Sequence, residues 1–447
     1  MNIKISFISL GCDKNLVDSE VMLGLLRDKG YTLINDEKEA DVIVVNTCGF
    51  IQDAKEESIE TIIEMGKYKD TGKCKALIVT GCLAQRYQEE LVNGMPEIDA
   101  ILGVSNYDKV IEAVESVLNN KKYIAFEDNS HHPQDYINRV ISSAGYSTYL
   151  KIAEGCDNHC TYCIIPKIRG KIKSRTIESL VKETEYLAEN GVKELILVAQ
   201  DTTKYGIDIY GEKKLPDLLR ELCKVDGIEW IRLLYCYPEE ITDELIEVIR
   251  DEEKVLNYLD MPIQHANNDI LKRMARKGTK EMIQNAISEL RKNIPDICLR
   301  TTLITGFPGE TREQFEDMKK FVQDIRFDRL GVFAYSPEEG TKAALFEDQI
   351  DDEVKESRKD EIMAMQQGIS KSINEELVGK VYPVIIEGYI PEDRVYCGRT
   401  YRDAPEVDGM IFVSCPYELI SGDIINVKVS SSNEYDLIGE ITDEYSE

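Results

Sequence analysis

Short apolar segments alternate with amphipathic helical segments along most of this chain, and this alternation constrains its fold more than any other feature. In residues 1–127, the apolar runs KISFIS, DVIVVN and KALIVT are each followed by a segment with helical periodicity. Such alternation is typical of parallel sheets whose strands are joined by right-handed helical crossovers. We therefore predict an N-terminal parallel α/β sheet domain in residues 1–127.

The same alternation returns in residues 147–375, after a segment without periodicity, residues 128–146, which we interpret as a linker. Six apolar runs, each followed by a helical segment, predict a β/α barrel that is incompletely closed. Functional groups of such barrels lie on the loops that follow the strands. Residues 376–447 contain short strands separated by Gly, Pro and Asp turns, which is typical of a small antiparallel β-barrel. The chain is thus predicted to be an α/β protein with three domains.

Three cysteines, Cys156, Cys160 and Cys163, directly follow the first strand of the predicted β/α barrel with the spacing C-x-x-x-C-x-x-C. We call them the first triplet. A zinc site would need a fourth protein ligand, and His159 is the local candidate. Neighbours in sequence rarely point at one small ion together, so an iron–sulfur cluster with three thiolates fits the spacing better. Such a cluster leaves one iron open for a substrate or cofactor.

A second triplet consists of Cys12, Cys48 and Cys82, each of which lies at the end of a predicted strand of the N-terminal domain. Ligand sites of open α/β sheets lie beyond the carboxyl ends of the strands, so these three thiols are expected to meet at one edge. The alternative is that they are three buried structural cysteines. The other six of the twelve cysteines are interpreted as small buried hydrophobic residues without a metal.

The net charge of −29 argues against a protein whose main task is to bind phosphate backbones, although solubility alone could also explain it. The charge is densest in residues 380–447, which carry a net charge of −9. Apolar runs stay far below the roughly 20 residues of a membrane span, and no signal-peptide cleavage site follows the first strand. We therefore expect a cytoplasmic protein without a membrane partner, in which cysteines serve metal or redox chemistry.

The segment TYLKIAEGCDNHCTYCIIP resembles the radical S-adenosylmethionine (SAM) superfamily, whose hallmark is C-x-x-x-C-x-aromatic-C after the first strand of a β/α barrel. The resemblance implies a 4Fe–4S cluster on the first triplet, with SAM bound at the fourth iron and Tyr162 beside it. It also implies SAM contacts after the second barrel strand, at Gln200 and Asp201, and after the fifth, at Arg300 and Gly306.

The segments LGC, NTCG and TGC, which contain the second triplet, resemble the N-terminal domain of methylthiotransferases. In that family these cysteines hold an auxiliary 4Fe–4S cluster, and a terminal TRAM domain recognises the substrate. The resemblance therefore implies two 4Fe–4S clusters and two SAM molecules per turnover. In the mechanism that the resemblance implies, one SAM would methylate sulfur carried at the auxiliary cluster. The other would yield a 5′-deoxyadenosyl radical, which would abstract hydrogen from the carbon to be modified.

The segments LGCDKNLVDSE, QDTTKYG, MPIQHA and GRTYRDAPEVDG resemble the branch of the family that modifies small-subunit ribosomal protein S-twelve on the β-carbon of an aspartate. One departure is Asp13, where that branch usually has proline. The alternatives are a tRNA adenosine methylthiotransferase and a non-catalytic iron–sulfur binding protein. The implied partner is the ribosomal protein, together with an electron donor and a sulfur donor that the sequence does not identify.

The charge of the terminal domain agrees with a basic protein substrate. An acidic barrel attracts a basic ribosomal protein and repels tRNA, so no direct tRNA substrate is expected. Four acids that flank strands or lie in the RDAPEVDG turn are expected to be exposed and to steer the partner. They are Asp393, Asp403, Glu406 and Asp408.

Overall fold

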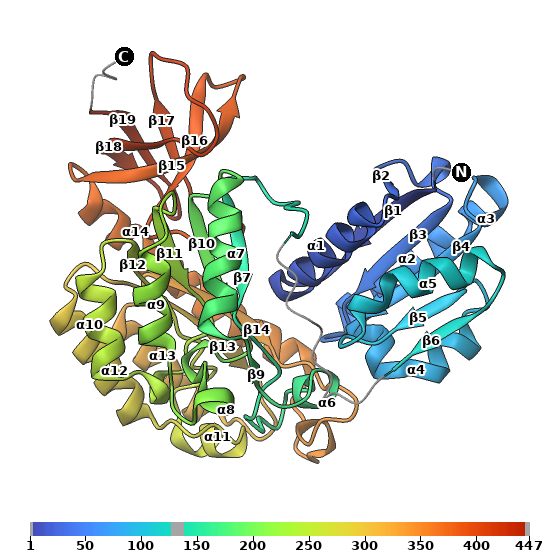
Figure 1. The fold of residues 1–447 in the computed structure, drawn as a ribbon. Helices are drawn as coiled ribbons and strands as arrows, with labels where there is room; N and C mark the ends of the chain where they lie inside the picture. The colour runs from blue at the N-terminus through green and yellow to red at the C-terminus, as the bar shows by residue number, and fades with distance from the viewer. Residues whose placement is uncertain (1–2, 127–137, 443–447) are drawn as a thin grey trace.

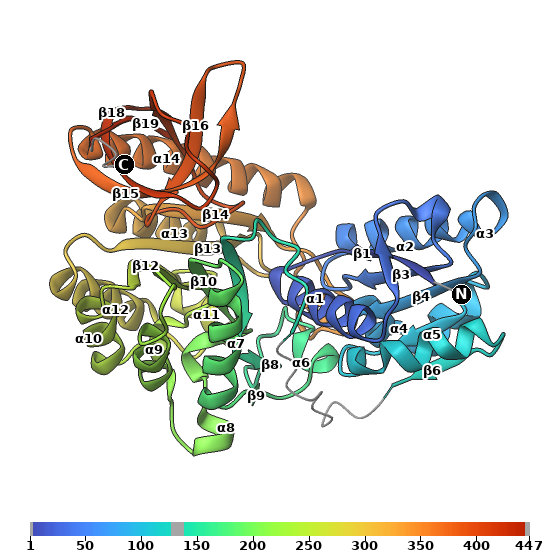
Figure 2. The ribbon, with the colours of Figure 1, turned by 45° about the horizontal axis from the view of Figure 1, so that its top comes forward.

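The computed structural model describes residues 3–126 and 138–442 of the 447-residue chain (Figure 1). Residues 127–137, which include most of the predicted linker, lie outside the described part. Three bodies follow one another along the chain, and the central one contacts both of the others (Figures 1 and 2). None of the helices in the described ranges is both long and apolar enough to cross a membrane.

The N-terminal body is a parallel sheet with strand order β2-β1-β3-β4-β5-β6, covered by helices. The predicted parallel α/β fold is confirmed. Three strands that the sequence did not reveal are only three residues long, too short to show a period. The strands are β1 (Lys4–Ser9), β2 (Thr32–Ile34), β3 (Val42–Thr47), β4 (Ala76–Gly81), β5 (Ala100–Leu102) and β6 (Tyr123–Ala125). The helices are α1 (Asp13–Asp28), α2 (Gln52–Gly66), α3 (Tyr68–Thr71), α4 (Cys82–Gly94) and α5 (Val110–Leu118).

The central body is a parallel sheet with strand order β14-β13-β12-β11-β10-β7, flanked by helices. The two end strands, β14 and β7, do not pair with each other in the described sheet, so the barrel is incompletely closed, as predicted. Its strands are β7 (Ser147–Lys151), β10 (Glu194–Val198), β11 (Trp230–Leu233), β12 (Val255–Asp260), β13 (Cys298–Thr305) and β14 (Arg329–Ala334), and a small separate sheet contains β8 (Ala153–Glu154) and β9 (Lys173–Ser174). Its helices are α6 (Ile165–Ile168), α7 (Ile177–Glu189), α8 (Ile207–Tyr210), α9 (Leu215–Cys223), α10 (Asp243–Asp251), α11 (Asn268–Arg273), α12 (Lys280–Asn293), α13 (Arg312–Ile325) and α14 (Asp352–Leu377).

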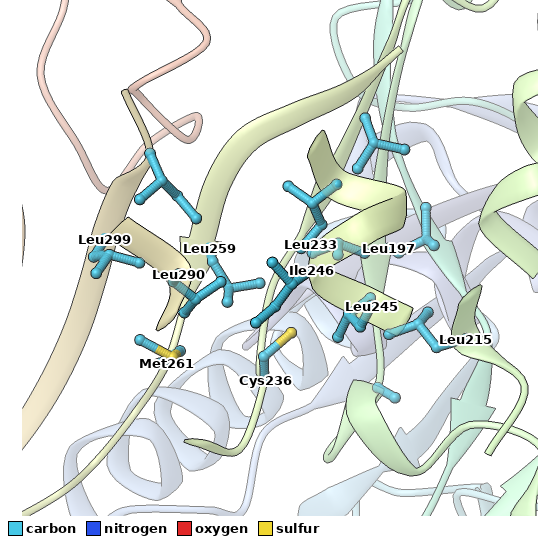
Figure 3. Close-up of a cluster of buried hydrophobic side chains, with 14 of the residues drawn as sticks. Leu197, Leu215, Leu233, Cys236, Leu245, Ile246, Leu259, Met261, Leu290 and Leu299 are labelled. Atoms are coloured by element: carbon cyan, nitrogen blue, oxygen red, sulfur yellow. The ribbon is translucent and has the colours of Figure 1, made fainter. Parts of the chain in front are cut away.

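The core of the central body lies between its strands and the covering helices. Figure 3 shows Leu197, Leu233 and Leu259 from three neighbouring strands, facing Leu245 of α10 and Leu290 of α12. All five side chains are buried. Burying a leucine is worth roughly 1.5–3 kcal/mol, so this layer holds the helices on the sheet.

Four of the covering helices begin at a threonine that accepts a hydrogen bond from a backbone N–H in the first turn. This N-cap satisfies one of the donors that a helix start leaves free, and it defines where the chain turns from loop into helix. The threonines are Thr176, Thr242, Thr279 and Thr311. The segments between the strand ends and the helices carry the candidate functional residues.

The C-terminal body is a closed five-stranded barrel with strand order β15-β16-β17-β19-β18. Its neighbours pair antiparallel except for β17 and β19, which are parallel. Its small apolar core is separate from the larger core of the central body. The strands are β15 (Val381–Ile390), β16 (Val395–Thr400), β17 (Ile411–Ser414), β18 (Ile424–Ser432) and β19 (Leu437–Ile441).

The C-terminal barrel is joined to the amino ends of the central strands by buried ion pairs. Glu194, the first residue of β10, accepts from Arg399 of β16 at 2.6 Å and from Arg232 of β11 at 2.9 Å. Arg329, the first residue of β14, donates to Asp403 at 2.6 Å. These side chains are nearly inaccessible to solvent, so the ion pairs lie inside the junction between the two bodies.

Two of the four acids expected to steer a partner lie inside this junction, and that expectation was wrong for them. Asp403 is 1% exposed, and the side chain of Asp408 is 2% exposed. They are buried because they neutralise two arginines of the central sheet: Asp403 pairs with Arg329, and Asp408 lies 3.3 Å from Arg300. The other two acids, Asp393 and Glu406, are exposed.

Candidate active site

The first triplet lies in the loop that follows β8. Cys156 and Cys160 are buried, and Cys163 is half-buried. Backbone hydrogen bonds hold the loop: the N–H of Cys156 donates to the carbonyl of Gly170 at 3.0 Å, and that of Cys163 to the carbonyl of Cys160 at 3.1 Å. Burial raises the pKa of Cys156 to about 11 and that of Cys163 to about 12. A bound metal would offset this cost, because thiolate ligands deprotonate when they coordinate.

Two of the predicted SAM contacts, Gln200 and Asp201, lie beside this loop, directly after β10. Asp201 is fully buried and accepts from Asn158 Nδ2 at 2.8 Å. The backbone N–H of the same Asn158 donates to Sγ of Cys156 at 3.4 Å. Oε1 of Gln200 is buried and has no hydrogen-bond partner in the described part of the chain. A buried acceptor without a partner is costly, so this oxygen fits a ligand that brings a donor, such as the amino group of SAM.

Tyr162 and Gly306 lie on two loops that pack against each other. The ring of Tyr162 contacts Phe307 edge-on, with the centroids 6.5 Å apart. Gly306 immediately precedes that phenylalanine and has a φ of +67°, which favours glycine. A Cβ at Gly306 would lie 2.3 Å from Cγ of Lys355, so a side chain has no room there. The loop after β13 is thereby held against the first triplet.

Arg300 lies further from the first triplet along β13 than Gly306 does. Its guanidinium pairs with Asp260 at 2.9 Å and with Asp408 at 3.3 Å, and so reaches toward the C-terminal barrel. These partners already neutralise its charge. Contact between Arg300 and SAM stays a prediction.

The second triplet follows β1, β3 and β4, which are neighbours in the N-terminal sheet. Cys12 is exposed, whereas Cys48 and Cys82 are buried. Two glycines allow the loops to approach. A Cβ on Gly11 would lie 2.8 Å from Cβ of Cys48, and one on Gly49 would lie 2.9 Å from the carbonyl carbon of Cys82. The structure thus brings the loops of all three cysteines together at one sheet edge.

Arg169, a buried residue of the central domain, connects the second triplet to the first. Its Nη2 donates to Sγ of Cys82 at 3.4 Å, and its Nη1 donates to Glu154 at 2.7 Å. Glu154 also accepts from Gln200 Nε2 at 3.0 Å. Burial opposes ionisation of Glu154, but the charges of Arg169 and Lys151 hold its pKa well below the usual range. A continuous path of hydrogen bonds therefore leads from Cys82 to Gln200.

A second contact across the same domain junction joins Lys14 to Tyr235. Lys14 lies in the first turn of α1, and its Nζ is 3.4 Å from the ring centroid of Tyr235 and 2.9 Å from Oδ1 of Asp13. Tyr235 follows β11 and has a φ of +60°, a conformation that residues other than glycine rarely adopt. Figures 1 and 2 both show α1 lying between the N-terminal sheet and β7.

Sequence reasoning missed these connecting residues. Arg169 follows the first triplet by six residues, and Lys14 follows Cys12 by two, so a basic residue close to each triplet was a visible signal. The direction in which each side chain points depends on how the domains dock, which local spacing does not reveal. The same holds for Glu154 and Tyr235.

The donor set of each triplet fits a three-thiolate cluster. Within residues 3–126 and 138–442, no group of three or more His, Cys, Asp or Glu side chains could hold a single metal ion. A four-iron cluster has a different requirement, because each thiolate binds a separate iron. Three thiolates bring negative charge into a buried site, and at the second triplet the guanidinium of Arg169 lies where it offsets that charge.

Three stretches of the chain match known families. Residues 4–103 match the uncharacterized protein family UPF0004, residues 150–322 match the Radical SAM superfamily, and residues 378–442 match the TRAM domain. A solved structure of the radical SAM methyltransferase TsrM from Kitasatospora setae, with cobalamin and a [4Fe-4S] cluster bound, aligns with a TM-score of 0.58. It is 14% identical and covers 86% of this chain and 81% of its own, so the likeness concerns the fold.

Curated relatives match over almost their whole length. The ribosomal protein uS12 methylthiotransferase RimO of Lachnoclostridium phytofermentans is 59% identical, and the alignment covers 98% of this chain and 99% of that protein. The protein of the same name from Clostridium botulinum (strain Loch Maree) is 56% identical, with 99% of both chains covered. That of Clostridium perfringens (strain ATCC 13124) is 55% identical, covering 99% of this chain and 98% of its own.

Proposed function

This chain belongs to the RimO family of ribosomal protein uS12 methylthiotransferases, within the radical SAM superfamily, and we propose that it attaches a methylthio group to the β-carbon of an aspartate of that ribosomal protein. Identity of 55–59% over nearly complete chains supports the same reaction on the same substrate. The three domains, taken as residues 1–127, 147–375 and 376–447 with a linker at 128–146, suit sulfur delivery, radical generation and substrate recognition.

The observation that carries this proposal is the pair of contacts between the two domains that hold the triplets. Arg169 of the central domain reaches Cys82, and Lys14, beside Cys12, lies on the ring of Tyr235. A reaction that abstracts hydrogen with one site and delivers sulfur with another needs both sites within reach of one carbon. The short contacts support a single reaction space shared by both triplets.

We assign one 4Fe–4S cluster to the first triplet and an auxiliary 4Fe–4S cluster to the second. When bound, these clusters would supply the electron for reductive cleavage of SAM and a carrier for the sulfur. The protein's own part is to fix the ligand loops. The backbone of Asn158 and the guanidinium of Arg169 donate to one sulfur of each triplet and so stabilise the thiolate form.

For SAM we propose contacts with Tyr162, Gln200 and Asp201. The unpartnered Oε1 of Gln200 would accept a hydrogen bond from the SAM amino group, and Asp201, which pairs with Lys204 at 3.2 Å, would lie beside it. The Tyr162–Phe307 contact closes the site on the side of the loop after β13 and helps to exclude water from reactive intermediates. We also propose SAM contacts at Arg300, on β13, and at Gly306, directly after it.

The C-terminal barrel is proposed to recognise the ribosomal protein, because its net charge of −9 suits a basic partner and repels tRNA. We further propose that the enzyme works in the cytoplasm, where this substrate is made and assembled.

The deciding experiment is anaerobic turnover of the reconstituted protein with ribosomal protein uS12 and tRNA present together. We expect mass spectrometry to find a methylthio group on the ribosomal protein and none on tRNA. Modification of tRNA instead would make this a tRNA methylthiotransferase. Absence of SAM cleavage by a protein that holds its clusters would make it a non-catalytic iron–sulfur protein.

A further inference from the structure

Asp13 and Lys14 form an ion pair at the edge of the second triplet, directly after Cys12. Each side chain is 7% exposed, and the Nζ–Oδ1 distance is 2.9 Å. The other carboxylate oxygen, Oδ2 of Asp13, is buried and has no hydrogen-bond partner in the described ranges. An ionised carboxylate with one oxygen unpaired is expensive to bury. Asp13 lies in the first turn of α1, where the helix dipole favours an acid, and its Oδ1 also accepts from the backbone N–H of Lys14 at 3.0 Å. These interactions leave Oδ2 without a partner among the described residues.

Tyr235, from the opposite side of the domain junction, completes the group. Its hydroxyl donates to the same Oδ1 of Asp13 at 3.3 Å, while the ammonium of Lys14 lies over its ring. This carboxylate oxygen thus accepts from the ammonium and the backbone N–H of Lys14 in the N-terminal domain, and from a hydroxyl of the central domain. The backbone of Tyr235 is left-handed at this position, with a φ of +60°. Strain of this kind is concentrated at ligand-binding and active sites.

We propose that Lys14 and the hydroxyl of Tyr235 form the seat for the carboxylate of the substrate aspartate, and that Asp13 fills this seat while substrate is absent. The inference rests on the proposed function, which supplies an aspartate as the acceptor. Asp13 carries the same functional group as that acceptor, so its carboxylate can occupy the place of the substrate carboxylate. Incoming substrate displaces Asp13, and Lys14 exchanges one carboxylate for another.

The position of the seat suits the chemistry. Cys12, two residues before Lys14, is the exposed member of the second triplet. The β-carbon of an aspartate is bonded directly to its carboxyl carbon. A carboxylate held by Lys14 therefore keeps the carbon to be modified beside the sulfur-delivering triplet. Tyr235 anchors the same carboxylate from the end of a central strand, so that the carbon also faces the radical-generating domain.

The seat predicts a charge-based choice of substrate. An ammonium group binds a carboxylate much more strongly than an amide of the same shape, because a hydrogen bond between two charged groups is stronger than one to a neutral group. The enzyme should therefore bind ribosomal protein uS12 better than a variant of it in which the acceptor aspartate is asparagine. Lys14 should be the origin of that preference.

The test is equilibrium binding of these two forms of the ribosomal protein to full-length, anaerobically reconstituted enzyme with SAM, measured by calorimetry. For the wild-type enzyme we expect the aspartate form to bind about tenfold more tightly than the asparagine form, from the strength of a hydrogen bond to a charged group. Lys14→Met should bring the ratio of the two affinities to about one, because it weakens binding of the aspartate form alone. Lys14→Arg, which keeps the charge, should restore most of the preference. A wild-type ratio in folded Lys14→Met would overturn the proposal.

Asp13 provides an independent test with the opposite sign. Asp13→Asn and Asp13→Pro both remove the competing carboxylate, and proline is tolerated at the first position of a helix, which Asp13 occupies in α1. Each variant should bind the aspartate form at least about threefold more tightly than the wild type, because an occupied seat lowers apparent affinity. Unchanged affinity in both variants would show that Asp13 does not fill the seat. The two Asp13 variants test the proposal even if Lys14→Met fails to fold.

Failure of the carboxylate seat can be distinguished from failure of the proposed function. If wild-type enzyme forms methylthio product on the ribosomal protein but binds both forms equally, only the carboxylate seat is wrong. If it forms no such product, the proposed function is wrong, and the seat with it. Iron content and thermal unfolding of each variant confirm that its fold and its clusters are intact.

Discussion

The two ends of the central barrel are built for different purposes. At the carboxyl ends of the strands lie the first triplet, the buried unpaired oxygen of Gln200 and the strained backbone of Tyr235. At the amino ends, buried ion pairs such as Glu194–Arg399 and Arg329–Asp403 attach the C-terminal barrel. In β/α barrels, catalytic groups gather at the carboxyl end and stabilising groups at the other. Substitutions at the two ends should therefore have separable effects, on chemistry and on stability.

The largest effect is expected from replacing the three cysteines of the first triplet with alanine. SAM cleavage should be abolished, and the iron content should fall from about eight to about four per chain, following the four-iron type assumed for each site. The fold should persist, because these residues lie on a loop at the carboxyl ends of the central strands. Iron analysis, product chromatography and circular dichroism measure the three outcomes. Loss of all iron from a folded variant would show that the two sites are not independent.

Replacing the second triplet with alanine tests whether the two triplets have separate roles. This variant should still cleave SAM to 5′-deoxyadenosine with a chemical reductant, while forming no methylthio product. The reason is that the second triplet lies in another domain and contains none of the residues proposed to bind SAM or the first cluster. SAM cleavage and methylthio product are both quantified by mass spectrometry. Complete loss of cleavage, with the first cluster intact, would contradict separate roles.

At the amino end, Glu194→Gln should affect stability and spare the chemistry. Glu194 pairs with two buried arginines, Arg399 and Arg232, and breaking a buried ion pair typically costs about 3–5 kcal/mol. Denaturant unfolding should show this loss in the free energy of unfolding. SAM cleavage per folded molecule should stay at the wild-type level. A variant with full stability and impaired cleavage would reverse the comparison between the two ends.

The same residue predicts a pH dependence. Burial alone would raise the pKa of Glu194, but the charges of Arg399 and Arg232 prevail and lower it to about 2. A carboxyl whose pKa is lower in the folded state stabilises the fold above its unfolded value of roughly 4.3, and this contribution is lost as the pH falls toward the folded value. The wild type should therefore lose stability between about pH 5 and pH 2, and Glu194→Gln should lose less over that range.

Patterns within one segment were predictable from the sequence. Strand and helix periodicity gave the three domains, and the six cysteines stood out because each triplet follows predicted strands. Contacts between distant segments were not predictable. Arg169 and Cys82 are far apart in sequence, as are Lys14 and Tyr235, and no local period reports such pairs. Asp403 was mistaken for a surface acid because its partner, Arg329, also belongs to another domain.

The smallest expected effect comes from the two acids of the C-terminal domain that are exposed to solvent. Asp393 and Glu406 are exposed, so reversing both to lysine should weaken binding of ribosomal protein uS12 only a few-fold, since exposed charges are worth about 0–1 kcal/mol each. The difference from the wild type should shrink as salt rises beyond roughly 0.15 M, where the Debye length is about 8 Å. SAM cleavage should not change, because its residues lie in another domain.

Asp403→Asn provides the matched control, since it also removes an acid from the barrel but at a buried position paired with Arg329. It should lower the free energy of unfolding while leaving the salt dependence of binding as in the wild type. Binding measured across a salt series separates the two variants. If the Asp393/Glu406 double reversal left affinity unchanged at every salt concentration, these two acids would not guide docking. Recognition would then depend on the uncharged surface of the barrel, or on the carboxylate seat at the opposite end of the central strands.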